Sequence, residues 1–128
     1  MLITMTTEKT VSEAAAALQE AVVANHFGVM QVHNLQDTMI KKGVAFSHEC
    51  LIFEVCNPQQ AKRVLEAKMG LSTALPCRIA IYEERGKTTL ATLKPTALLA
   101  MFGAPELETV AQEVENAIVN IMTEAARE

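Results

Sequence analysis

The chain contains no tryptophan, and aromatic residues make up only 4% of its 128 residues. Half of the residues are hydrophobic, so a sizeable core can form, but it must be built from aliphatic side chains and methionine. No apolar stretch approaches the roughly 20 residues that a membrane-spanning helix needs. We therefore expect a single domain, residues 1–128, with no membrane partner.

Positive charge is scarce as well. The chain has 11 Lys and Arg against 15 Asp and Glu, which gives a net charge of −4. Adjacent basic residues occur only at Lys41-Lys42 and Lys62-Arg63, so there is no stripe that would follow a phosphate backbone. Nucleic acid is therefore excluded as an expected partner.

Cysteine is limited to three residues, and no C-x-x-C spacing joins any two of them. An odd number of cysteines without a basic and apolar leader predicts free thiols in the cytoplasm and not a disulfide framework. Each glycine stands alone, so the sequence has no phosphate-binding loop. We expect no cofactor.

Turn and capping residues divide the remaining sequence into short strands and helices. Thr10 and Glu13 form a capping box before a helix, and Gly70 is expected to end the helix that starts at Pro58. The expected order is strand, helix, strand, short helix, strand, helix, hairpin and helices. This order predicts an α+β fold in two layers, with a mostly antiparallel sheet of about five strands and helices largely on one face.

Residues 45–56 are the longest strand candidate. Leu51, Phe53 and Val55 alternate on one side and should face the helices. The other side of the sheet is expected to carry apolar residues: Met30, Val32, Cys50 and Ile52. An uncovered apolar face usually finds a partner, so we expect a homodimer.

Cys56-Asn57-Pro58 joins this strand to the next helix and is the most informative local motif. Asn57 suits the N-cap and Pro58 the first helical position. A thiol at a helix start is favoured as a thiolate by the helix dipole, so Cys56 is a candidate nucleophile. The alternative is that Cys56 is a small packing residue before a capped helix, because free cysteine is often buried.

The motif also carries a resemblance to a known family. The residues 53–61, Phe-Glu-Val-Cys-Asn-Pro-Gln-Gln-Ala, are followed by Leu75-Pro76-Cys77, a hairpin and Lys94-Pro95. Together with Phe27-Gly28-Val29, this pattern resembles the domain of unknown function 302, over about residues 20–125. The resemblance implies a small, dimeric fold of antiparallel sheet and helices from bacteria or archaea. It supplies no reaction, but it marks five residues as binding candidates: Cys56, Asn57, Pro58, Pro76 and Cys77.

The distance between Cys56 and Cys77 depends on how the two strands are connected. A strand, a helix and a further strand normally form a parallel crossover, which would place the two thiols at opposite edges of the sheet. A loop at residues 71–76 that doubles back would instead bring them together. We favour the separated arrangement, which makes a redox pair within one subunit the weaker hypothesis.

His48 and Cys50 lie two residues apart on the expected strand and would share a face. They are the only metal-ligand candidates with a useful spacing, and they are weak ones, because zinc requires three or four ligands. We therefore expect no metal site.

Two functions remain open. The first is a non-enzymatic binding or accessory domain that holds an unknown small ligand or partner protein near Cys56 and Asn57. The second is a thiol protein in sulfur transfer or redox handling, with Cys56 as its reactive atom. We favour the first, because neither a general base nor a second close thiol is assured.

Overall fold

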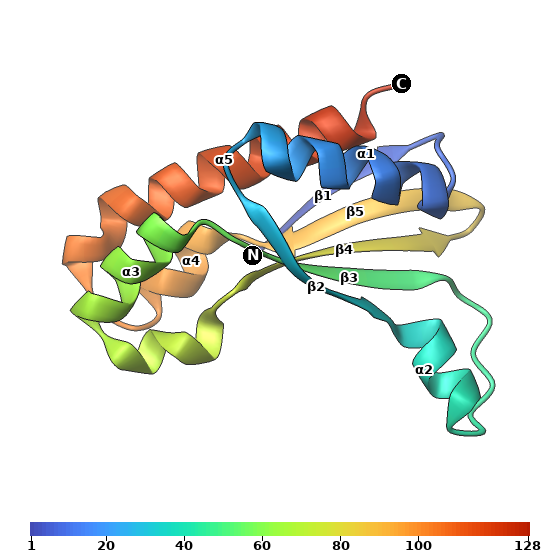
Figure 1. Ribbon diagram of the computed structural model, residues 1–128, viewed down its shortest axis with the longest axis horizontal. Helices are drawn as coiled ribbons and strands as arrows, with labels where there is room; N and C mark the ends of the chain where they lie inside the picture. The colour runs from blue at the N-terminus through green and yellow to red at the C-terminus, as the bar shows by residue number, and fades with distance from the viewer.

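Five antiparallel strands form a single sheet, and the computed structural model describes all residues, 1–128 (Figure 1). The strand order is β1-β5-β4-β3-β2, and each pair of neighbours is antiparallel. The strands are β1 (Leu2–Thr7), β2 (Gly28–Asn34), β3 (Cys50–Cys56), β4 (Cys77–Glu84) and β5 (Lys87–Leu93). The predicted α+β fold is confirmed.

Two long helices, α1 (Val11–Ala24) and α5 (Glu108–Ala126), lie side by side over the same face of the sheet (Figure 1). The predicted capping box starts α1: the Thr10 hydroxyl accepts from the Glu13 N–H, and the Glu13 carboxylate accepts from the Thr10 N–H. Apolar residues at helical spacing in α1 and α5 pack onto inward residues of the central strands. This contact forms the aliphatic core, in which Phe53 is the largest fully buried side chain.

The shorter helices gather at the two ends of the sheet. α3 (Pro58–Ala67), the 3₁₀ segment η1 (Met69–Ala74) and α4 (Pro95–Ala100) cluster at one end, while α2 (Leu35–Lys41) projects from the other (Figure 1). A short 3₁₀ turn, η2 (Pro105–Leu107), leads into α5. No residue of α2 is buried, so this helix adds nothing to the core.

Three expectations about local structure are wrong. β3 begins at Cys50 and not at residue 45, because residues 44–49 form a loop after the left-handed Gly43. α3 ends at Ala67, before Gly70, and residues 69–74 continue as a 3₁₀ helix instead of an irregular loop. Val32 is the register partner of buried Phe53, so it lies on the helix side of the sheet and not on the uncovered side.

The expected parallel crossover between β3 and β4 is also wrong. The two strands are antiparallel neighbours, and Val55 is the register partner of Cys77. α3 and η1 therefore lead away from the end of β3 and return to the same end of the sheet. This is the doubled-back arrangement, which the sequence favoured less than the parallel crossover. As a result, Cys56 and Cys77 lie at the same end of the sheet.

No helix in the structure combines the length and the apolar character required to cross a lipid bilayer.

Candidate functional site

Asn57 fixes the start of α3 with both ends of its side chain. Its Oδ1 accepts hydrogen bonds from the N–H groups of Gln59 (3.0 Å) and Gln60 (3.1 Å). Its Nδ2 donates to the backbone oxygen of His26 at 3.1 Å. Pro58 occupies the first helical position, where no N–H is needed. The Cys-Asn-Pro motif is thus a helix cap that also ties α3 to the segment before β2.

Leu75-Pro76-Cys77 brings the chain back to the sheet. η1 ends at Ala74, the Leu75–Pro76 peptide bond is cis, and β4 begins at Cys77. Because Cys77 lies opposite Val55, the returning segment stands directly beside the end of β3. Both motifs that the family resemblance marked therefore meet at one place.

α4 closes the other side of this region and is anchored to α5. The Thr96 N–H and hydroxyl both donate to Oε1 of Glu115, at 3.1 and 2.7 Å. The Lys68 amine, at the end of α3, donates to the Phe102 backbone oxygen at 3.2 Å. Arg63 and Glu113 form an ion pair of 2.8 Å that joins α3 to α5. These contacts join α3 and α4 to α5 and join the end of α3 to the turn after α4.

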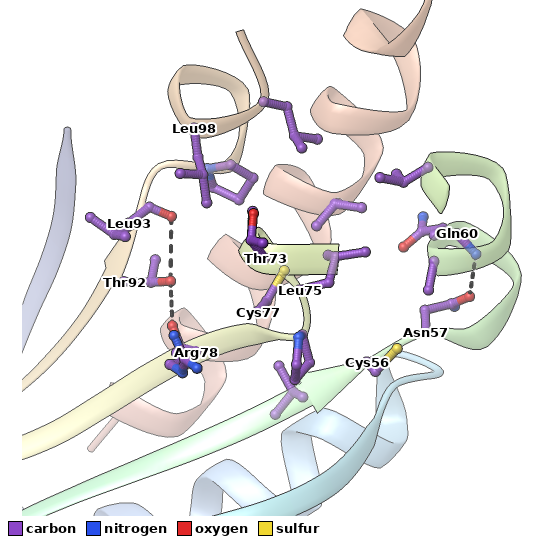
Figure 2. Close-up of a pocket in the computed structure, with 18 of the residues that line it drawn as sticks. Cys56, Asn57, Gln60, Thr73, Leu75, Cys77, Arg78, Thr92, Leu93 and Leu98 are labelled. Atoms are coloured by element: carbon purple, nitrogen blue, oxygen red, sulfur yellow. Dashed lines mark hydrogen bonds between the residues drawn. The ribbon is translucent and has the colours of Figure 1, made fainter. Parts of the chain in front are cut away.

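A cavity of about 280 Å³ lies between these elements (Figure 2). The ends of β3, β4 and β5 line it together with α3, η1, α4 and one residue of α5. Most lining residues are apolar: Phe27, Val55, Ala61, Val64, Ala74, Leu75, Pro76, Leu93, Pro95, Leu98, Leu99, Met101, Phe102 and Val114. Cys56, Asn57 and Cys77 also line it, while Pro58 does not.

The polar side chains around the cavity are almost all engaged with the protein. The Thr92 hydroxyl donates to the Arg78 backbone oxygen at 2.7 Å, and the Thr73 hydroxyl donates to the Gly70 oxygen at 2.9 Å. The exception is Gln60, whose Oε1 is buried and has no hydrogen-bond partner. Figure 2 shows this side chain extending from α3 towards the other lining residues. A buried acceptor left unpaired costs about 1–3 kcal/mol, so it marks a place where a donor would be favourable.

The thiols at the site are held in their neutral form. Burial raises the pKa of Cys56 and of Cys50 above the ordinary value. Burial, with a smaller contribution from the charge of nearby Cys56, raises the pKa of Cys77 to about 11. Burial of Cys56 therefore acts against the thiolate that its position at the start of α3 favours. At neutral pH both cavity thiols are protonated and weakly nucleophilic.

The two metal-ligand candidates do not converge. His48 lies outside β3, so it does not share a strand face with Cys50; its Nδ1 lies 3.3 Å from the Glu83 backbone oxygen. No group of three or more His, Cys, Asp or Glu side chains in the structure is placed to hold a metal ion.

Comparison with known proteins places the chain in a family. The family model described as "Domain of unknown function DUF302" matches residues 3–125. The chain belongs to the DUF302 family. The resemblance inferred from the Cys-Asn-Pro and Leu-Pro-Cys motifs is thus confirmed, and it extends over nearly the whole chain.

A solved structure agrees with this assignment. The chain is similar to an uncharacterized conserved DUF302 protein from Bacillus stearothermophilus, with 31% sequence identity and a TM-score of 0.93. The similarity covers 98% of each chain. A comparison with curated proteins gave no match. The DUF302 family thus accounts for the fold and does not supply an activity.

Two parts of the cavity were not predicted from the sequence. Gln60 was not considered, although its position three residues after the N-cap places it one turn from Asn57 on the same side of α3. The wall formed by α4 and the turn after it, with Leu98 in the helix and Phe102 in the turn, was also not predicted. No spacing in the sequence relates α4 to α3. The two helices are linked by tertiary contacts, because both are bonded to α5 and Lys68 donates to the Phe102 backbone oxygen.

Proposed function

We propose that this DUF302 chain is a non-enzymatic binding domain that holds a small, largely apolar molecule in the cavity between α3, η1 and α4. The observation that carries the proposal is the cavity itself: about 280 Å³, lined mainly by hydrocarbon and fixed by hydrogen bonds to α5. Ligand sites are typically apolar concavities with a few placed polar groups, and this cavity has that composition.

The state of the thiols supports binding over thiol chemistry. Sulfur transfer or disulfide exchange needs a thiolate, and burial raises the pKa of Cys56 and Cys77. A neutral thiol behaves as a small hydrophobic group and fits the rest of the lining. We therefore propose that both cysteines shape the cavity and that neither is a nucleophile.

A cavity-filling variant tests the proposal. Ala61 lines the cavity, so Ala61→Phe should fill part of it and weaken binding of neutral bicyclic fragments at least tenfold in an NMR titration. Ala67 lies on the same helix, exposed and away from the cavity, and Ala67→Phe is the matched control that should bind as the unmodified chain does. A fragment screen with no saturable binder, or equal binding by Ala61→Phe, would overturn the proposal.

We also propose that the chain forms a homodimer through β2 in the cytoplasm. β2 is an edge strand without Lys, Arg, Asp, Glu or Pro, and its one irregularity is a register shift between Val29 and Gln31. Its Met30 and Val32 side chains are 60% and 41% exposed. Three free thiols fit a reducing compartment. Light scattering should report a dimer that Met30→Lys converts to a monomer; a monomer at every concentration would contradict the proposal.

A further inference from the structure

We propose that the cavity selects uncharged molecules of on the order of ten non-hydrogen atoms that carry one hydrogen-bond donor, and that Gln60 Oε1 accepts from this donor. The inference rests on the proposed binding function and deepens it. Three properties of the cavity lead to it: its volume, its lack of free charge and its single unpaired acceptor.

The volume sets the size of the molecule. A dry cavity of about 150 Å³ lined by aliphatic and aromatic residues holds benzene, which has six non-hydrogen atoms. In proportion, the cavity of about 280 Å³ holds on the order of ten such atoms. This is the size of two fused rings or a short branched chain, and it is too small for a nucleotide or a long acyl chain.

The lining offers no free charge that could pair with an ionised ligand. Arg78 is the one charged residue that lines the cavity. Its neighbour Cys77 faces the helix side with Val55, so the Arg78 side chain points to the opposite face, where its Nε lies 3.5 Å from Glu54. Lys68 donates to Phe102 and does not line the cavity. A charged group placed against this lining would therefore find no side chain of opposite charge, which is unfavourable.

The unpaired oxygen sets the polar feature of the molecule. Asn57 Oδ1 already accepts two hydrogen bonds, and the Thr73 and Thr92 hydroxyls already donate to backbone oxygens. Gln60 Oε1 alone is buried and unpartnered. An N–H or O–H group in the ligand would pair with it and remove the cost of the unpaired acceptor, whereas a hydrocarbon or a pure acceptor would not.

Three probes of equal size separate these possibilities. Indole offers an N–H donor, benzofuran offers only an acceptor, and indene offers neither; each has a fused five- and six-membered ring. Dissociation constants from NMR titration should rank indole at least fivefold tighter than indene, with benzofuran no tighter than indene. The shifted resonances should belong to residues that line the cavity.

Variants of α3 assign the preference to one oxygen. Gln60→Met keeps the length of the side chain but removes the acceptor, so it should bind indole and indene equally. Gln59→Met makes the same change at the exposed neighbouring position and should retain the preference for indole.

The outcomes separate this inference from the binding proposal. Saturable binding of all three probes without a preference for indole, or a preference that survives Gln60→Met, would overturn the inference and leave the binding function intact. A preference for benzofuran would show that the amide donates and does not accept, which also overturns it. No saturable binding of any probe would contradict the binding function itself.

Discussion

The side-chain nitrogen of Asn57 donates a hydrogen bond to the backbone oxygen of His26, 3.1 Å away. His26 has a φ of +65°, a left-handed conformation that is unfavourable for a residue with a Cβ. The bond connects the end of α1 and the start of β2 to the cap of α3. The Asn57 side chain therefore stabilises both the start of α3, which lines the cavity, and the left-handed turn at His26.

Replacing Asn57 should consequently affect two elements at once. Asn57→Ala removes the α3 cap and the bond to His26, and we expect it to lower the free energy of unfolding by about 1–2 kcal/mol. Asn57→Asp keeps the capping oxygen but loses the donor, so it should recover part of this loss. Urea denaturation of both variants measures the two contributions; an Asn57→Ala variant as stable as the unmodified chain would contradict the capping role.

Reaction with a thiol reagent should be slow at every cysteine of the folded chain. Burial raises the pKa of all three thiols, so the thiolate fraction at pH 7 is below that of a free thiol with a pKa near 8.5. Alkylation followed over pH and resolved by peptide mass should show Cys77 as the slowest. Rapid labelling of Cys56 near pH 7, absent in Cys56→Ser, would restore the thiol-chemistry hypothesis.

Stability should fall in alkaline solution because of Cys77. Its pKa is about 11 in the folded chain and 9.0 without the protein environment. Between these values the unfolded chain releases the proton while the folded chain keeps it, so the free energy of unfolding decreases as pH rises. The loss should reach about 2–3 kcal/mol near pH 11. Cys77→Ala removes this titration, so its urea midpoint should decline less between pH 8 and 11 than that of the unmodified chain.

The exposed ion pair between Glu8, in the turn after β1, and Lys87 should contribute to stability in a way that depends on acid pH. The Lys87 amine lies 2.7 Å from the Glu8 carboxylate and lowers the pKa of Glu8 below 4.5. The pair therefore stabilises the fold above pH 4.5, and the contribution disappears as pH falls through the lowered pKa. Lys87→Met should cause a small loss of stability at pH 7 that vanishes in acid and in 1 M salt. A loss that persisted under both conditions would have another cause.

Much of the fold could be predicted because local chemistry determines it. The hydroxyl of Thr10 and the carboxylate of Glu13 identify the start of α1, and the alternation of Phe53 and Val55 identifies the buried side of β3. The direction of β4 relative to β3 could not be predicted in this way. It depends on how α3 and η1 turn back, and the handedness preference for crossovers applies only once the strands are known to be parallel.

The candidate site was predicted in part for the same reason. The residues of Cys-Asn-Pro and Leu-Pro-Cys were identifiable as motifs, and the antiparallel register of Val55 and Cys77 brings them together. The pKa of Cys56 was not predictable from its position before α3. The helix dipole favours a thiolate, but burial opposes it, and burial depends on the tertiary packing around Cys56.

β3 and β4 are adjacent antiparallel strands, and a turn of two residues is enough to join such a pair. The chain instead inserts residues 57–76 between them, and these residues build most of one cavity wall. Within this insertion the core directly constrains Val64 and Leu71, which are buried in the same cluster as the sheet and the long helices, and leaves more freedom to the residues that face only the cavity. Substitutions at cavity-facing positions of residues 57–76 should therefore change the shape of the cavity without changing the strand order of the sheet.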